Sequence, residues 1–123
     1  MWSCRNPAQL PLPQAAEALS PYYAGPDGRG MIEAVIRATP ERLSPGGRLL
    51  MVHNSVTDFP RSVALMRSLG LTLRVLGESS LELRPLFDRD WLDRLGGVAH
   101  GLYSVRDGKA YETIYAVEAR REG

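Results

Sequence analysis

The chain has 123 residues, 44% of them hydrophobic, with 15 basic against 14 acidic side chains. This length and composition predict one globular domain with a real core and exclude a disordered chain. The balanced charge argues against a nucleic-acid or anionic-membrane surface. A lone cysteine, Cys4, and two distant histidines, His53 and His100, exclude a disulfide framework and a zinc site. The sequence has no long apolar run and no pattern typical of a signal peptide, so we expect a cytoplasmic protein without a membrane partner.

The first third of the chain moves from a short strand to a helix. Residues 1–4 form an apolar run that halts at Asn6-Pro7, which is typical of a buried strand. A proline-broken, turn-rich stretch follows over 11–30. Apolar residues then recur at helical spacing over 31–43, and Pro40 inside this pattern predicts a kink or a new helix start.

The middle of the chain predicts a strand, a helix and a second strand. Residues 48–52 are a short apolar run between turn signals and predict a buried strand, which ends at His53-Asn54-Ser55. Asp58 is a suitable N-cap for a helix that continues to Leu69. Residues 71–76 alternate in polarity, as a strand with one buried face does.

The last third predicts a short helix and a hairpin. Alternation returns at 81–83, and a helix is expected over 88–95. Asp107-Gly108 is a strong two-residue turn signal between the arms 101–106 and 109–120. Helices alternating with strands predict an α/β fold whose mixed sheet has parallel strands and a C-terminal antiparallel hairpin.

Two polar stretches follow the first two predicted strands, where parallel sheets carry their sites. They are Asn6-Pro7-Ala8-Gln9 and His53-Asn54-Ser55. The first resembles the Asn-Pro-Pro-aromatic motif of class I S-adenosylmethionine-dependent methyltransferases that modify amino nitrogens, with alanine and glutamine at its last two positions. Gly25-Pro26-Asp27-Gly28, an amphipathic helix and the segment LSPGGRL at 43–49 follow in that family's order. The branch that methylates glutamine in release factors, with its small-domain relatives, is the one that the chain resembles most.

The resemblance implies a partial Rossmann-like methyltransferase fold, in which residues 1–123 are one domain and the C-terminal half of the parent. It implies transfer of a methyl group from S-adenosylmethionine to a nitrogen of a protein, nucleic acid or small molecule. Asn6 and the Pro7 backbone would accept hydrogen bonds from the target nitrogen and favour its reactive, pyramidal form. Ala8, Gln9 and the His53–Ser55 stretch would bind the substrate.

The cofactor-binding half of that family has no counterpart in the chain. Five residues precede Asn6, so no glycine-rich turn can stand before it, and GPDGRG at 25–30 lacks the context of a phosphate loop. We therefore expect the isolated chain to bind S-adenosylmethionine weakly or not at all and to be inactive. The open edge of the first strand predicts a homo-oligomer or pairing with a missing N-terminal half.

Other interpretations stay open. The chain could be a non-catalytic subunit or interaction domain that keeps the methyltransferase scaffold. Asn6-Pro7 is also an ordinary strand-ending turn. His53 could act as a general base or be a hydrogen-bonded wall residue, and the arginines are expected mostly on a solvated face.

Overall fold

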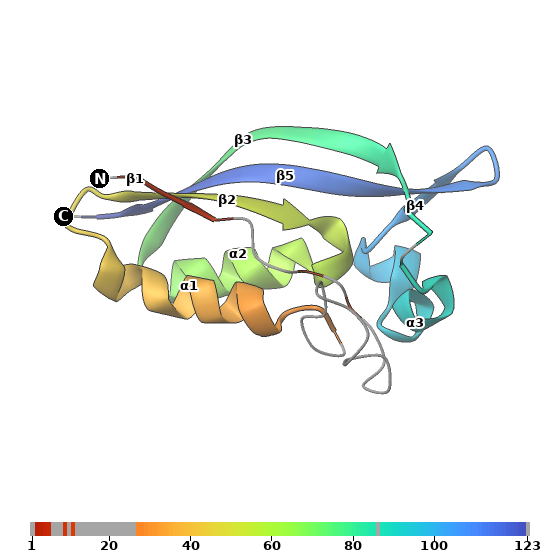
Figure 1. The fold of residues 1–123 in the computed structure, drawn as a ribbon, viewed down its shortest axis with the longest axis horizontal. Coiled ribbons are helices and arrows are strands. Elements are labelled where there is room, and N and C mark those ends of the chain that lie inside the picture. Colours follow the sequence, from red (N-terminus) through yellow and green to blue (C-terminus); the bar gives the residue numbers. More distant parts are fainter. Residues whose placement is uncertain (1, 6–8, 10, 12–26, 86, 123) are drawn as a thin grey trace.

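The computed structural model describes residues 2–5, 9, 11, 27–85 and 87–122 (Figure 1). The predicted sites Asn6, Pro7 and Ala8 lie outside the described residues. No described helix is both long and apolar enough to cross a membrane.

The described helices and strands alternate along the chain. In order they are β1 (Trp2–Arg5), α1 (Gly30–Arg42), β2 (Arg48–Asn54), η2 (Ser55–Thr57), α2 (Phe59–Ser68), β3 (Leu71–Glu82), α3 (Arg89–Arg94), η3 (Gly97–His100), β4 (Ser104–Arg106) and β5 (Lys109–Arg121).

The sheet has the strand order β1-β2-β5-β3, and β4 pairs with β5. β1 runs parallel to β2, whereas the pairings of β2, β3 and β4 with β5 are all antiparallel. The predicted fold class, a partial Rossmann-like methyltransferase fold built on parallel strands, is therefore wrong. The physical reason is that β5 inserts between β2 and β3, so β3 never pairs with the parallel strands that precede it.

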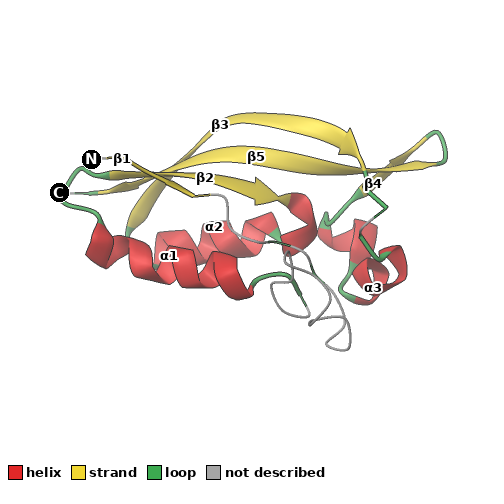
Figure 2. Ribbon diagram, viewed as in Figure 1, coloured by secondary structure: helices red, strands yellow, loops and turns green. Residues whose placement is uncertain are grey.

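Helices α1 and α2 lie on one face of the sheet, and α3 lies beyond the end of β2 (Figure 2). The strand β2 alternates between buried and half-buried residues, so one of its faces packs against these helices. The main core consists of apolar residues from both layers: Ile32, Ile36, Leu43, Leu49, Met51, Met66, Leu71 and Ala119. A second apolar cluster, at the α3 end, consists of Val56, Phe87, Leu92, Leu102 and Tyr103.

The helix signals of the sequence are mostly confirmed. The Asp58 side chain accepts a hydrogen bond from Arg61 N at the start of α2, and Asp88 caps α3. The helix does not restart at Pro40, because Thr39 lies inside α1 and its hydroxyl donates to Val35 O. Pro40 removes one amide donor from the last turn, where the helix tolerates the loss and continues to Arg42.

Strands β3 and β5 form a long ribbon at one side of the sheet. The two alternating segments predicted near 71–76 and 81–83 are one strand, interrupted by a bulge between Val75 and Gly77. The predicted Asp107-Gly108 turn is confirmed, and both of its residues have positive φ.

Candidate functional site

At the carboxyl end of β2, Gln9 meets the predicted site residues His53 and Asn54. Gln9 is 7% exposed, and its side-chain amide lies against this end of the strand. Gln9 Nε2 donates to Val52 O at 2.8 Å, and Gln9 Oε1 accepts from Asn54 N at 2.7 Å. A backbone residue of a parallel strand would bond to the same two groups on either side of His53. The Gln9 amide thus continues the β1–β2 ladder beyond Arg5, which pairs with Met51.

His53 lies beneath this contact and is fully buried. Its Nδ1 is 2.8 Å from Asn54 O, which can only accept, so Nδ1 carries the proton. Nε2 then accepts from Ser62 Oγ at 2.7 Å. The imidazole edge packs on the Phe59 ring, at 5.1 Å between centroids. Burial lowers the pKa of His53 to about 4, so the ring is neutral near pH 7.

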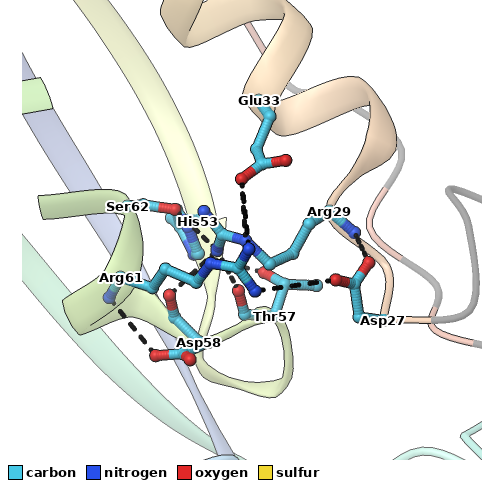
Figure 3. A network of polar contacts seen from close by, with 8 residues as sticks. All are labelled: Asp27, Arg29, Glu33, His53, Thr57, Asp58, Arg61 and Ser62. Carbon is cyan, nitrogen blue, oxygen red and sulfur yellow. Dashed lines mark hydrogen bonds and ion pairs between the residues drawn. The ribbon is translucent and has the colours of Figure 1, made fainter. Parts of the chain in front are cut away.

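Arg29, directly before α1, is the buried cation of this region (Figure 3). Its Nη1 donates to Thr57 O, to Asp58 O at 3.0 Å and to Ser62 Oγ at 2.9 Å. Its Nε lies 3.6 Å from Glu33 Oε1. Burial lowers the pKa of Arg29 and the Glu33 carboxylate opposes this, but an arginine keeps its proton in proteins.

Gln9, Arg29, His53, Thr57 and Ser62 are called the β2-end junction below. Thr57 connects Gln9 with Arg29. Its backbone carbonyl accepts from Arg29, while Thr57 Oγ1 donates to Asn54 O at 3.0 Å and lies 3.2 Å from Gln9 Oε1. The junction leaves no room for a larger residue at Gly28, whose φ is +75°. A Cβ there would lie 2.8 Å from Thr57 Cγ2 and 3.0 Å from Pro11 N.

A charged rim surrounds the Arg29 side of the junction (Figure 3). Asp27 Oδ1 accepts from Arg29 N at 3.0 Å, a local bond that is typical of an aspartate in a turn. The exposed Arg61 lies 3.8 Å from both Asp27 and Glu33. These surface pairs add little stability by themselves, but they place two carboxylates around the buried cation.

Asn54 and Ser55, the other predicted site residues, differ in exposure. Asn54 is half-buried, and only its backbone takes part in the hydrogen bonds of the junction. Ser55 is buried, and its hydroxyl donates to Leu102 O and accepts from Thr113 N, both at 2.9 Å. Ser55 therefore ties the end of β2 to β5 and to the second apolar cluster.

The junction is a rigid support and not a reactive centre. Ser62 and His53 have the hydrogen bond of a nucleophile and its base, but both are fully buried, so no substrate reaches them. The side chain of Gln9 likewise bonds to β2, and its predicted substrate contact stays a prediction. Among the described residues, no group of three acidic, histidine or cysteine side chains is placed to hold a metal ion.

Arg29 is the central residue that the sequence alone did not reveal. It stands among turn residues, and the sequence predicts that the arginines lie mostly on a solvated face. Its one signal is its position, four residues before Glu33 at the start of an apolar helix, where an i,i+4 pair can form.

No protein-family model matches the chain, and no curated protein matches it. Its fold is similar to a chain of the solved Mtq2–Trm112 complex of E. cuniculi, which is described as responsible for the methylation of the eRF1 translation termination factor. The TM-score is 0.59 at 16% identity, and the match covers 98% of this chain and 51% of that chain. The chain thus spans about half the length of the solved chain that it matches, and that neighbour belongs to a methyltransferase complex.

Proposed function

We propose that this chain forms the acceptor side of an S-adenosylmethionine-dependent methyltransferase that modifies a nitrogen. The observation that carries the proposal is the match of nearly the whole chain to half of a chain from a methyltransferase complex. The rest of the catalytic unit would then come from polypeptide outside these 123 residues.

The junction supports this proposal by fixing the flanks of the 6–8 segment. Arg5 pairs with Met51, and Gln9 bonds on both sides of His53, so both flanks are held to β2. Fixed flanks lower the cost of ordering acceptor groups, which is how positioning accelerates a reaction. Asn6 and the Pro7 carbonyl would accept hydrogen bonds from the target nitrogen, with Ala8 beside them.

The remaining predicted residues would shape the wall of the same site. Asn54 is half-buried and would face the acceptor, while the buried His53 and Ser55 would hold its backbone in place. Gln9 would act as a positioning residue. The acceptor could belong to a protein, a nucleic acid or a small molecule.

The described residues do not fit S-adenosylmethionine. The side chains of Gln9, His53 and Ser62 bond within the junction, and the groove beside α1 is small, at about 180 Å³, with a mostly apolar lining. The cofactor would supply the methyl group from its sulfonium, and its binding residues would lie on the other polypeptide. We expect no measurable binding of S-adenosylmethionine to the isolated chain by calorimetry.

The test is methyl transfer by the assembly that the tagged chain forms in its own cells. Tritium from labelled S-adenosylmethionine should pass to an acceptor, and Asn6→Ala should reduce the rate about hundredfold, as loss of a preorganised polar group does. Binding of the labelled cofactor to the assembly should be unchanged. Ser79→Ala, on the exposed surface of β3, is the control and should keep full activity.

A non-catalytic subunit is the second candidate, favoured because the side chains of Gln9, His53 and Ser62 are engaged in hydrogen bonds within the junction. The same assay separates the two functions. Transfer that needs the chain but is unchanged by Asn6→Ala would establish the subunit role, and an assembly without transfer would refute the methyltransferase proposal.

A further inference from the structure

A chain of hydrogen bonds connects the buried cation Arg29 with the backbone of Asn54. Its side chains come from three elements, because Arg29 precedes α1, Ser62 lies on α2 and His53 lies on β2 (Figure 3). All three side chains are almost completely buried. Water therefore does not compete for these bonds, and each is electrostatically stronger than it would be at the surface.

Every bond of this chain has one possible direction. A guanidinium can only donate, so Ser62 Oγ accepts from Arg29 Nη1 at 2.9 Å. The hydroxyl proton of Ser62 then points to His53 Nε2, which lies 2.7 Å away. His53 carries its own proton on Nδ1 and donates it to Asn54 O at 2.8 Å. A reversed chain would need an acceptor on Arg29, and an arginine side chain has none.

The backbone of Asn54 is held on both sides. Its carbonyl accepts from His53 Nδ1 and, at 3.0 Å, from Thr57 Oγ1. Its N–H donates to Gln9 Oε1 at 2.7 Å. Because both polar groups of this residue are bonded, its backbone angles and the direction of its Cα–Cβ bond are fixed. The half-buried side chain of Asn54 therefore leaves the end of β2 in a set direction.

Arg29 also holds the turn that follows Asn54. Asp58, at the start of α2, has a φ of 60°, which is uncommon for a residue other than glycine. Arg29 Nη1 donates to the carbonyl before this residue, Thr57 O, and to Asp58 O itself. Such a conformation costs about 1–3 kcal/mol and persists where the surrounding structure holds it. The same cation thus acts on Asn54 through two side chains and on the adjoining turn directly.

The positive charge of Arg29 favours the neutral ring that the chain needs. Burial and the Arg29 cation lower the pKa of His53, whereas the Asn54 carbonyl and Asp58 raise it. A protonated ring would donate from Nε2 as well, and Ser62 Oγ, which already accepts from Arg29, would then have to turn its own proton away. The direction of the bonds and the charge of the ring are therefore linked.

We propose that Arg29 is a positioning residue of the acceptor site, which acts through Ser62 and His53 to fix the backbone of Asn54. The Asn54 side chain is the group that this arrangement presents to the acceptor. The inference rests on the proposed function, in which Asn54 faces the acceptor. It adds to that site two buried residues, Arg29 and Ser62, that act on the acceptor only through others.

The test removes the middle of the chain. Arg29→Met would remove several bonds at once, so its effect on activity would be mixed with a large loss of stability. Ser62→Ala removes the hydroxyl between Arg29 and His53 and leaves the bonds of Arg29 to the two backbone carbonyls. Ser68→Ala is the matched control, because Ser68 is an exposed serine of the same helix whose hydroxyl donates to a carbonyl of that helix.

Two NMR measurements on the full chain detect the positioning itself. Hydrogen exchange of the Asn54 amide should become about fivefold faster in Ser62→Ala, relative to the amide of the buried Val117 on β5. A general loss of stability would accelerate both amides alike. The pKa of His53 should rise, because the Ser62 hydroxyl donates to the neutral ring. Both quantities should be unchanged in Ser68→Ala.

Methyl transfer by the assembly gives the functional measurement. Ser62→Ala should lower kcat about tenfold, as a small displacement of a positioned group does, and leave KM for S-adenosylmethionine unchanged. Unchanged exchange at Asn54 or an unchanged pKa of His53 would overturn the inference. So would an unchanged kcat in an assembly whose transfer depends on Asn6. An assembly that transfers no methyl group would instead refute the proposed function, and the role of Arg29 in the acceptor site with it.

Discussion

Arg29 and Glu112 are fully buried charged side chains of the described part of the chain, and their surroundings differ. Arg29 lies in the β2-end junction, where backbone and hydroxyl oxygens surround one end of its guanidinium. Glu112 lies on β5, and its Oε1 accepts from the half-exposed Arg84 at 3.0 Å. Within the described part of the chain, Glu112 Oε2 has no hydrogen-bond partner, and neither have Nε and Nη2 of Arg29, so the two groups differ in the bonds that they do make.

The difference follows from what each group can do when it leaves water. A guanidinium keeps its proton even when buried, so Arg29 needs acceptors around it. A carboxyl group can be protonated instead, and burial raises the pKa of Glu112 while Arg84 opposes the rise. Arg29 therefore stays charged in the folded protein, whereas the charge of Glu112 depends on pH.

Removing the cation should have the largest effect on stability. Arg29→Met would leave the carbonyls of Thr57 and Asp58 and the Ser62 hydroxyl without their donor. We expect the free energy of unfolding to fall by about 3–5 kcal/mol, the usual cost of breaking a buried charged network. Urea denaturation measures this change in the free energy of unfolding.

Arg61→Met is the matched control, since Arg61 is 58% exposed and pairs with carboxylates of the same rim. The free energy of unfolding should fall by less than about 1 kcal/mol in Arg61→Met. Equal losses in the two variants would contradict the central role of Arg29.

The junction should also make the protein sensitive to acid through His53. The pKa of His53 is about 4 in the folded protein, against 6.5 when exposed. Between these values the unfolded chain binds the proton more readily, so stability falls as the pH drops from 6.5 to 4. The full loss is about 3 kcal/mol, from about 1.4 kcal/mol per pKa unit.

His53→Gln removes this titration, so the free energy of unfolding should change less over that pH range. His100→Gln, at an exposed position of η3, should keep the original slope. Thermal unfolding between pH 4 and pH 7 measures both variants. An unchanged slope in His53→Gln would contradict the assignment.

The sequence predicted most elements because their signals are local. Caps such as Asp58 and Asp88, the Asp107-Gly108 turn and the apolar run of β2 each depend on neighbours in the chain. The sheet topology has no such local signal. The alternation of helices and strands could not show that β5 inserts between β2 and β3, because that pairing joins residues far apart in sequence.

The same limit explains which site residues were found. His53 and Asn54 were singled out because they end a buried strand, and the structure does bring Gln9 against them. Arg29 and Glu112 were not singled out. Each is a charged residue in a stretch of sequence that predicts an exposed side chain. Only their long-range contacts, to Ser62 and to Arg84, show that they are buried.

The smallest expected effect on stability concerns Glu112. Because the pKa of Glu112 is raised in the folded state, the unfolded chain loses its proton first, and stability falls as the pH rises above the ordinary range of a glutamate. Arg84→Met should steepen this fall and cost about 1–2 kcal/mol at pH 7, a modest value because Arg84 is half-exposed. Glu112→Gln should flatten it and make Arg84→Met nearly neutral in a double-mutant cycle. If Arg84→Met costs the same in both backgrounds, its contact with the Phe87 ring, 5.1 Å from the guanidinium, carries the effect instead.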